Sequence, residues 1–380
     1  MKIVHVIVGL NIGGAELMLS RLCEALTADF EDEHIVISLT DLGEVGEGLQ
    51  ARGISVIPLG MCGVWGRVRG ITRLIRQLHK TKPDIVQTWM YHSDLLGGLA
   101  ARLVGVKNII WGIRTTDVSR GGSKSTILVR KLCAWLSGYV PSIIVCAAQA
   151  SRRAHISIGY TADRMVVVPN GFDMARLVAS EQEGEALRAA HGVTVDQLVI
   201  GSLGRFNEVK DHPTFIKAAG LIAGDFPHVK FLLIGRNVDD NNTLLKSEIM
   251  LTGYEERFIL LGERQDVSVC LKAMDVFCLH SFTEGFPNVL GEAMSLGLPS
   301  VTTDVGDAAF LLGDNGFVVP SQSPHELAKA LARMITLSED ERCSIGRGAY
   351  KRIADNFTMK CAELSYKDIY DRLHLNKDFN

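Results

Sequence analysis

Short runs of apolar, mostly β-branched residues alternate with amphipathic stretches along nearly the whole chain. Runs of this kind are typical of buried strands, whereas the stretches between them have the spacing of helices. The predicted strands cover residues 3–8, 34–39, 54–57, 84–88, 108–113, 142–146 and 165–168, and then residues 198–202, 229–234, 258–261, 276–280, 300–303 and 317–319. Strands that alternate with helices in this way predict parallel, doubly wound α/β sheets.

The alternation stops in a polar, helical interval at residues 173–196 and then starts again, which predicts two sheets joined by a hinge. A chain of 380 residues with 47% hydrophobic residues also suits two domains better than one core. We predict an N-terminal Rossmann-like domain over residues 1–175 and a C-terminal one over residues 176–355. Only helical patterning follows the last strand, so residues 356–380 are expected to form a helix that returns to the first domain.

The charge is uneven between the two halves, although the whole chain has a net charge of only −3. Residues 1–173 carry 19 Lys and Arg against 14 Asp and Glu, a net charge of +5, and the remainder carries 21 against 29, a net charge of −8. This balance gives no general reason to expect nucleic-acid binding. The eight cysteines show no C-x-x-C pair and are interpreted as small core residues in a reducing cytosol.

The first strand is followed by a glycine pair, Gly13 and Gly14, which opens a predicted helix. Glycine lets the backbone come close to a ligand, and the free N–H groups at a helix start favour a phosphate. A tight turn without a ligand is the alternative at this position. The G-x-G-x-x-G fingerprint of dinucleotide-binding domains is absent, which disfavours a nicotinamide-dependent oxidoreductase.

Two cations, Arg205 and Lys210, follow the first strand of the second sheet. An Arg supplies planar hydrogen bonds and a Lys supplies a point charge, and together they can hold a diphosphate and stabilise the charge that develops as it leaves. The alternative is surface ion pairing with Glu208 or Asp211.

Two carboxylates, Glu284 and Glu292, flank a segment that begins in a loop and continues into a helix. We expect Asn288 to cap this helix, which would run to about residue 296. A helix start favours a diphosphate, and carboxylates accept hydrogen bonds from the adjacent hydroxyl groups of a ribose or a hexose. The alternatives are a loop salt bridge for Glu284 and a buried helix carboxylate for Glu292.

These segments together resemble a known family. Residues 284–292 look like the E-x7-E element of retaining glycosyltransferases with the two-domain GT-B fold, specifically glycosyltransferase family 4. Four other segments also resemble segments of that family. They are residues 13–16 for its glycine loop, residues 168–173 for its domain junction, Gly204 and Arg205 with Lys210 for its diphosphate clamp, and residues 316–319 for the turn after its last strand.

The resemblance implies an α/β GT-B fold, in which two Rossmann-like domains face each other across a cleft and the C-terminal helices cross back to the first domain. It implies that Arg205 and Lys210 hold the donor diphosphate, Glu292 the ribose and Glu284 the transferred sugar. Backbone groups near the glycine pair and in the E-x7-E segment would complete the donor site. The donor-binding residues implied there are Gly13, Gly14, Gly285, Phe286, Asn288, Val289 and Leu290. No metal or cofactor is implied, which fits the absence of a D-x-D motif, and transfer would retain the sugar's configuration.

The first domain departs from the family pattern at two strand ends. Many relatives have a His at the end of the strand that covers residues 84–88, whereas here His92 is the nearest polar candidate for a catalytic role. Alternatively, His92 is solvent-exposed or caps the following helix. The next strand end, where a His is again frequent, has Arg114 and Asp117, which we assign to an acceptor phosphate or saccharide.

The segment 66–80 predicts an amphipathic helix with a basic stripe. The stripe consists of Arg69, Arg73, Arg76 and Lys80, and it lies opposite an apolar stripe of Val68, Ile71, Ile75 and Leu78 that is expected to pack on the sheet. The basic stripe fits anionic lipid headgroups, with a solvated face as the alternative. The chain has no apolar run long enough to span a bilayer, so membrane contact is expected to be peripheral.

We therefore predict a glycosyltransferase at the cytoplasmic face of a membrane. It would transfer a hexose or N-acetylhexosamine from a UDP-sugar to a saccharide on a polyprenyl diphosphate, in the synthesis of O-antigen, capsule or exopolysaccharide. The predicted partners are the donor, the lipid-linked acceptor and an anionic inner-leaflet surface that contacts the basic first domain. Three alternatives stay open, namely a GDP-sugar donor, a hydrolysing UDP-sugar 2-epimerase and a non-catalytic sugar-nucleotide-binding protein.

Overall fold

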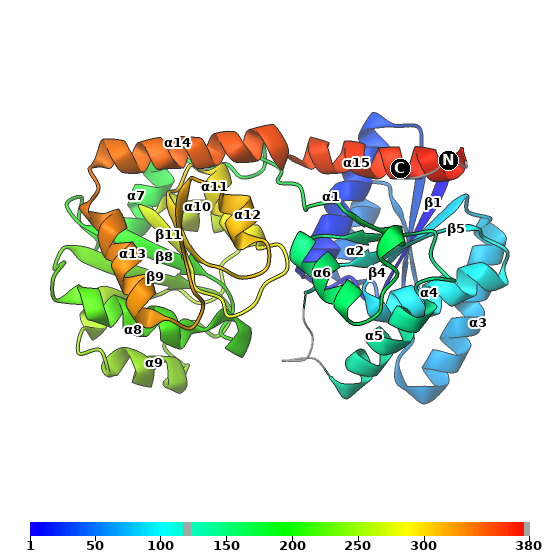
Figure 1. The fold of residues 1–380 in the computed structure, drawn as a ribbon, viewed down its shortest axis with the longest axis horizontal. Helices are drawn as coiled ribbons and strands as arrows, with labels where there is room; N and C mark the ends of the chain where they lie inside the picture. Colours follow the sequence, from blue (N-terminus) through cyan, green and yellow to red (C-terminus); the bar gives the residue numbers. More distant parts are fainter. Residues whose placement is uncertain (117–122, 376–380) are drawn as a thin grey trace. The chain divides into compact units, whose positions relative to one another are not determined.

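The computed structural model describes residues 1–116 and 123–375, which form two compact α/β units (Figure 1). Unit 1 combines Met1–Gly171 with the segment that begins at Met359, and unit 2 is Phe172–Thr358. The chain therefore crosses between the units twice, after residues 171 and 358. The sequence pattern placed the two boundaries after residues 175 and 355.

Unit 1 is built on a seven-stranded parallel sheet with the order β3-β2-β1-β4-β5-β6-β7. The strands are β1 (Lys2–Ile7), β2 (Glu33–Ser38), β3 (Ser55–Pro58), β4 (Ile85–Trp89), β5 (Asn108–Ile113), β6 (Ile143–Cys146) and β7 (Met165–Val167). The central strands are buried along nearly their whole length, which is why they read as continuous apolar runs rather than as alternating ones.

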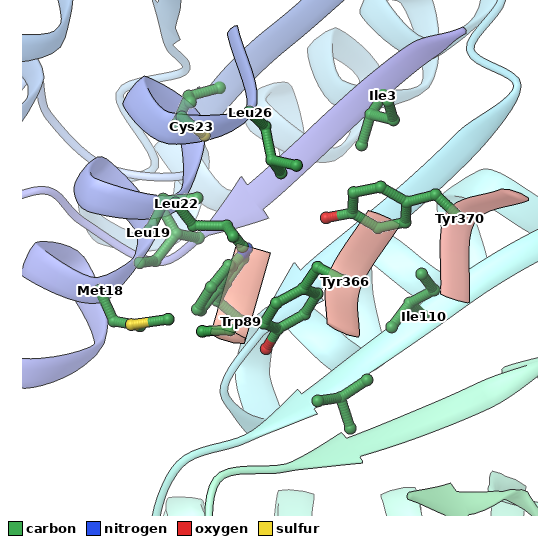
Figure 2. Close-up of a cluster of buried hydrophobic side chains, with 14 of the residues drawn as sticks. Ile3, Met18, Leu19, Leu22, Cys23, Leu26, Trp89, Ile110, Tyr366 and Tyr370 are labelled. Atoms are coloured by element: carbon green, nitrogen blue, oxygen red, sulfur yellow. The ribbon is translucent and has the colours of Figure 1, made fainter. Parts of the chain in front are cut away.

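Helices cover both faces of this sheet. They are α1 (Gly14–Asp29), α2 (Gly43–Ala51), α3 (Gly63–Thr81), α4 (Tyr91–Leu103), α5 (Lys124–Leu136) and α6 (Gln149–Ser157), with a short 3-10 helix at Ala162–Arg164. One core cluster lies under α1, α2 and the C-terminal helix α15 (Met359–His374), and the other lies under α3, α4 and α5. Tyr366 and Tyr370 of α15 pack beside Trp89 in the first cluster (Figure 2). The prediction that the C-terminal helix returns to the first unit is thus confirmed.

Unit 2 repeats this architecture with a six-stranded parallel sheet in the order β10-β9-β8-β11-β12-β13. The strands are β8 (Leu198–Leu203), β9 (Val229–Ile234), β10 (Phe258–Leu260), β11 (Val276–Leu279), β12 (Ser300–Thr303) and β13 (Gly316–Val319). The helices are α7 (Glu181–Ala190), α8 (His212–Ala223), α9 (Thr243–Met250), α10 (Val267–Lys272), α11 (Asn288–Ser295), α12 (Ala308–Leu312), α13 (Pro324–Thr336) and α14 (Glu339–Asn356), with 3-10 helices at Glu208–Lys210 and Glu255–Arg257.

All thirteen predicted strands are present, and each begins and ends within one residue of its predicted bounds. The two doubly wound sheets confirm the predicted fold class. The apolar stripe predicted on α3 is partly wrong, because the buried line of that helix runs through Leu74 and Leu78, whereas Ile71 is 39% exposed. Five of the eight cysteines are buried as expected, but Cys62 and Cys343 are exposed.

The described helices give no candidate for a membrane span. Among residues 1–116 and 123–375, every helix is too short or too polar to cross a membrane.

Candidate functional site

The strand order of unit 2 reverses between β8 and β11, which are neighbours in the sheet. Strands β9 and β10 continue on one side of this pair, and β12 and β13 continue on the other. In open parallel sheets, ligands bind outside the carboxyl ends of the strands at such a switch point. Arg205 and Lys210 follow β8, and Glu284 follows β11, so the fold brings all three predicted residues to this switch point.

Lys210 and Glu284 form an ion pair at the switch point. The Lys210 Nζ donates to Glu284 Oε1 at 2.6 Å, and the same oxygen accepts a hydrogen bond from Ser281 Oγ at 2.6 Å. The Lys210 and Glu284 side chains are 21% and 14% exposed, so the pair is shielded but still reachable from solvent. The loop salt bridge considered for Glu284 therefore exists, with Lys210 as its partner. A donor that bound both residues would have to share or replace this contact.

His280, the residue after β11, joins the two strand-end loops through its ring. Its Nε2 lies 2.6 Å from Ser202 Oγ on β8, and its Nδ1 lies 2.6 Å from the backbone oxygen of Lys210. A carbonyl oxygen only accepts, so Nδ1 carries the proton and Ser202 donates to Nε2. Burial, reinforced by the nearby His212, lowers the pKa of His280 well below its usual range. The ring is therefore neutral at physiological pH and fixes the backbone of Lys210.

Backbone hydrogen bonds hold the loop that carries Glu284. The Phe282 amide donates to the Val209 oxygen at 2.9 Å, which ties this loop to the loop after β8. On the other side, the Asp307 amide donates to the Gly285 oxygen at 2.9 Å. Gly306 permits this approach, because its φ is +58° and a Cβ there would lie 2.3 Å from the Gly285 oxygen. The loop is thus positioned by main-chain contacts on both sides.

Arg205 has an exposed side chain and lies on the same strand-end loop as Lys210. It makes no hydrogen bond or ion pair with any residue in the ranges 1–116 and 123–375. The backbone on either side of it is fixed, because the Gly204 amide donates to Ile234 and the Phe206 amide donates to Arg236, both at 2.8 Å. A free guanidinium on a fixed loop is suited to bidentate recognition of phosphate oxygens.

The remaining predicted donor residues lie on and before α11. The expectation that Asn288 caps this helix is wrong, because Pro287 holds the N-cap position and Asn288 is the first helical residue. Pro287 already has a non-helical backbone, with a ψ of 94°, so the helix can only begin after it. Gly285, Asn288, Val289 and Glu292 are partly exposed.

Two predicted donor residues have side chains that belong to the core. Leu290 is fully buried, and the Phe286 ring stacks on Phe172 with the ring centres 6.1 Å apart and packs against Phe357 at 5.9 Å. Phe286 and Leu290 can therefore contact a donor only through their backbone atoms.

In unit 1 the strand order reverses between β1 and β4, and the predicted glycine pair follows β1. Gly13 is the N-cap of α1, and Gly14 is its first residue. The carboxylate of Glu16, in the first turn, folds back so closely that a Cβ on Gly13 would lie 2.4 Å from Glu16 Oε2. Burial raises the pKa of Glu16. Phosphate binding at the glycine pair stays a prediction, and it requires this carboxylate to turn away.

His92 is the second residue of α4, beside the carboxyl end of β4. The residue that joins them, Met90, has φ 72° and ψ 156°, a conformation that is costly for any residue except glycine. Its amide donates to the Gly112 oxygen at 2.9 Å, which helps to hold it there. Asp94, in the first turn of α4, is buried, and burial raises the pKa of its carboxyl to about 7. The catalytic role of His92 stays a prediction.

Arg114, the predicted acceptor residue, is engaged within unit 1. Its Nη1 donates to Asn170 Oδ1 at 2.8 Å, its Nη2 donates to the Tyr366 hydroxyl group, and its guanidinium lies 4.5 Å from the Trp89 ring centre. These contacts connect the end of β5 to α15, which is a structural role that the sequence did not indicate. An acceptor contact would have to compete with them. The other acceptor candidate, Asp117, lies outside the described residues.

One buried cluster in the described part of the chain has the residue types of a metal site, namely His5, Cys23 and His34. Trp89 Nε1 donates to His5 Nδ1 at 3.3 Å, so the proton of His5 is on Nε2, which lies 3.0 Å from His34 Nδ1. A protonated Nε2 cannot bind a metal ion. The cluster is therefore better explained as a hydrogen-bonded part of the core of unit 1.

Three residues that were not predicted from the sequence also shape the switch point of unit 2: His280, Ser281 and Gly306. His280 is the last residue of the predicted strand at 276–280 and Ser281 directly follows it, and that position was the signal that could have indicated them. Gly306 had no comparable signal, because its contact with the Glu284 loop is nonlocal.

Two family descriptions match the chain in succession. "Glycosyltransferase Family 4" matches residues 12–176, and "Glycosyl transferases group 1" matches residues 197–336. The first match lies in unit 1 apart from its last residues, and the second lies in unit 2.

Among curated relatives, the chain is 26% identical over 318 residues to an Escherichia coli protein, UDP-Gal:alpha-D-GlcNAc-diphosphoundecaprenol alpha-1,3-galactosyltransferase. That match covers 82% of this chain and 81% of the relative. The chain is also 24% identical to the capsular polysaccharide biosynthesis glycosyltransferase CapM of Staphylococcus aureus, and this match covers 83% of this chain and 84% of CapM. Among solved structures, Anabaena Alr3699/HepE in complex with UDP has the same fold, with a TM-score of 0.85 at 23% identity over 98% of this chain and 100% of that one.

Proposed function

This chain belongs to glycosyltransferase family 4 and has the GT-B fold, and we propose that it is a retaining hexosyl- or N-acetylhexosaminyltransferase. The proposed donor is a UDP-sugar, and the proposed acceptor is a saccharide carried on a polyprenyl diphosphate. One observation carries the proposal: the Lys210–Glu284 ion pair lies at the switch point of unit 2 together with the guanidinium of Arg205, which has no partner among the described residues.

In the proposed reaction, the bond between the anomeric carbon and the terminal phosphate oxygen of the donor breaks, and negative charge develops on the leaving diphosphate. Arg205 offers two parallel hydrogen bonds to this diphosphate and Lys210 offers a point charge, which stabilise the transition state more than the bound donor. Glu284 accepts hydrogen bonds from the transferred sugar, and Glu292 accepts them from the ribose. Lys210 exchanges its bond to Glu284 for one to the diphosphate when the donor binds.

We propose that these two cations take the part that a divalent metal plays in other sugar-nucleotide enzymes. Retention follows if the acceptor hydroxyl attacks from the face that the diphosphate leaves, where a phosphate oxygen can take the hydroxyl proton. The new glycosidic bond then has the configuration of the old one, and no protein side chain has to act as the base. His92 is proposed as a polar contact to the donor sugar.

The choice of substrates follows the relatives. The name of the E. coli relative specifies a UDP-galactose donor and an acceptor on diphosphoundecaprenol, and CapM is named for capsular polysaccharide synthesis. We therefore propose a role in surface polysaccharide assembly at the cytoplasmic face of a membrane. Because a polyprenyl-linked acceptor lies in a bilayer, we also propose peripheral membrane binding through the basic first unit.

A donor screen tests the proposal directly. The protein is incubated with UDP- and GDP-sugars in the presence of GlcNAc-diphosphate-polyprenol, and the release of nucleoside diphosphate is measured together with the mass and anomeric configuration of the product. We expect UDP release that depends on the acceptor and a product that retains the donor configuration. A GDP-sugar preference would correct the donor, and an inverted product would contradict the retaining mechanism.

The same screen separates the two other functions that the sequence left open. A hydrolysing epimerase would release a C2-inverted sugar from UDP-N-acetylglucosamine without any acceptor. A non-catalytic binding protein would bind UDP-sugars but release no UDP with any acceptor. Either result would overturn the proposed activity.

A further inference from the structure

Helix α5 of unit 1 exposes a stripe of large apolar side chains. Leu128, Leu132 and Trp135 are 60%, 42% and 72% exposed, and Tyr139, just after the helix, is 74% exposed. At about 100° per residue, the three helical positions fall within one narrow arc of the helix. The opposite side of α5 is already packed, with Cys133 fully buried in the core. The helix is thus apolar on two sides, and only one of them is covered by unit 1.

The stripe continues onto the neighbouring helix. α4 packs beside α5 (Figure 1), and its last residue, Leu103, is 75% exposed. The guanidinium of Arg102 donates to the backbone oxygens of Val140 and Tyr139 at 2.9 and 3.5 Å, which fixes the end of α4 against the end of α5. These residues form one apolar surface, which we name the α4–α5 patch. Its members are Leu103, Leu128, Leu132, Trp135 and Tyr139.

The segment of sequence that carries this patch is rich in basic residues and poor in acidic ones. Between residues 95 and 162 the sequence has a single acidic residue, Asp117. The same segment has nine basic residues, namely Arg102, Lys107, Arg114, Arg120, Lys124, Arg130, Lys131, Arg152 and Arg153. Lys124 and Lys131 are exposed and lie on the same arc of α5 as the apolar stripe. The patch is therefore an apolar surface with a positively charged border.

The basic stripe predicted on α3 extends this border. α3 packs against α4. The side chains of the stripe are exposed as predicted, and they are Arg69, Arg73, Arg76 and Lys80. Between Glu47 and Asp84 the sequence contains no acidic residue. The three helices α3, α4 and α5 thus present cations and large apolar side chains as one layer on one face of the sheet.

We propose that the α4–α5 patch is a membrane-docking surface, which inserts its leucines and Trp135 into the headgroup region of a bilayer that contains anionic lipids. Trp and Tyr side chains are enriched at this depth, and Lys side chains at the border can reach the lipid phosphates. Two facing copies of this chain would bring the exposed Lys124 and Lys131 against the same cations of the other copy, which disfavours a second copy as the occupant. The inference rests on the proposed function only in that a polyprenyl-linked acceptor lies in a bilayer.

Vesicle co-sedimentation tests the proposal. The full chain is mixed with vesicles of phosphatidylcholine alone and with vesicles that also contain phosphatidylglycerol. We expect binding to the anionic vesicles that weakens with added salt, and a blue shift in fluorescence that is absent in Trp135→Phe. The double variant Leu128→Ser/Trp135→Ser should lower the partition coefficient at least about tenfold, since both side chains leave the bilayer. Lys124→Glu/Lys131→Glu should lower binding to the anionic vesicles only.

The matched control is Leu244→Ser/Leu251→Ser in unit 2, which removes two leucines that are 68% and 82% exposed at and just after α9. This control should bind vesicles like the unchanged protein. Equal binding by the Leu128→Ser/Trp135→Ser variant and the control would overturn the proposal, as would equal binding of the unchanged protein to neutral and anionic vesicles. Concentration-dependent dimerisation that this patch variant abolishes, without any loss of vesicle binding, would also overturn it and assign the patch to a second copy.

Turnover with a water-soluble, short-chain acceptor separates this proposal from the enzymatic one. The Leu128→Ser/Trp135→Ser variant should keep this turnover and lose activity only with acceptors embedded in vesicles. If the unchanged protein binds vesicles but transfers no sugar to either acceptor, the enzymatic proposal fails while the docking surface stands.

Discussion

Glu284→Gln tests the exchange of partners at the switch point of unit 2. The substitution keeps the shape of the side chain and removes its charge. In the structure, Glu284 Oε1 accepts from Lys210 Nζ and from Ser281 Oγ, each at 2.6 Å. If Lys210 leaves this carboxylate to bind a diphosphate, the ion pair competes with the ligand. Without the charge on Glu284, that competition is weaker.

The magnitude follows from the burial of the pair. A fully exposed ion pair contributes about 0.2–1 kcal/mol, whereas loss of one partner from a fully buried pair costs about 3–5 kcal/mol. Lys210 and Glu284 are 21% and 14% exposed, which places their pair between these limits, at about 1–2 kcal/mol. Removal of that competition strengthens UDP binding by about 5- to 30-fold, because about 1.4 kcal/mol corresponds to a factor of ten.

Turnover should change in the opposite direction. If Glu284 contacts the transferred sugar, the variant loses a charged hydrogen bond that forms in the transition state, and kcat should fall about 100-fold or more. Isothermal titration with UDP measures the first effect, and UDP release with saturating donor and acceptor measures the second. Ser281→Ala is the control, since it removes a hydrogen bond to the same carboxylate oxygen and keeps the charge.

One pair of results would refute this reasoning. If Glu284→Gln weakened UDP binding and lowered kcat to the same extent, Glu284 would contact the nucleotide rather than the sugar, or would only support the fold. A comparison with Glu292→Gln separates these cases. That variant should weaken UDP binding, since Glu292 is assigned to the ribose.

Three further outcomes are expected. Arg205→Ala should lower turnover about 10- to 100-fold for every donor, because the diphosphate is common to all of them, and equal turnover would place the diphosphate elsewhere. The urea midpoint should not change, because this guanidinium is exposed and has no partner among the described residues. Gly291→Ala should destabilise unit 2 by about 1–3 kcal/mol in urea denaturation, because its Cβ would lie 1.9 Å from the Phe172 ring, and an unchanged midpoint would contradict that packing. Burial lowers the pKa of His212 to about 4 and that of His280 well below its usual range. As the pH falls below about 6.5, these two histidines therefore take up protons in the unfolded chain but not in the folded one. The free energy of unfolding of unit 2 should be constant above about pH 6.5 and fall by about 1.4 kcal/mol for each pH unit below it and for each of these histidines. Pulsed hydrogen exchange of β8 in urea measures this fall, and a flat profile down to about pH 5 would contradict it.

The sequence determined the strands, because a buried parallel strand needs a continuous apolar run and its polar ends are visible in the same few residues. It also indicated the switch-point residues of unit 2. Arg205, Lys210 and Glu284 each follow a predicted strand, and carboxyl ends of parallel strands share one edge of a sheet. The local sequence pattern was sufficient to predict the strands and these three residues. It failed by one residue at Asn288, since a proline and an asparagine are both compatible with a helix start.

Only the tertiary structure decided which of these groups touch. Lys210 and Glu284 are 74 residues apart, and the strand order that makes β8 and β11 neighbours brings them to 2.6 Å. His280 bonds the backbone of Lys210 for the same reason. Among these residues, Arg114 has the most distant partner in sequence, because Tyr366 lies on α15, 252 residues away. A side chain that the sequence assigned to an acceptor is thus hydrogen-bonded to the C-terminal helix.

The helices of unit 1 show a second feature that hydrophobic periodicity does not predict. Periodicity shows that a helix is apolar on a given side, but it does not show whether anything covers that side. Ile71 was expected in the core and is exposed, while Leu128 and Trp135 form a surface that no periodicity distinguished from a buried one. Whether an apolar side chain is covered depends on which other element packs over it. That partner is set by strand order and helix packing across the whole unit, and only the folded chain shows it.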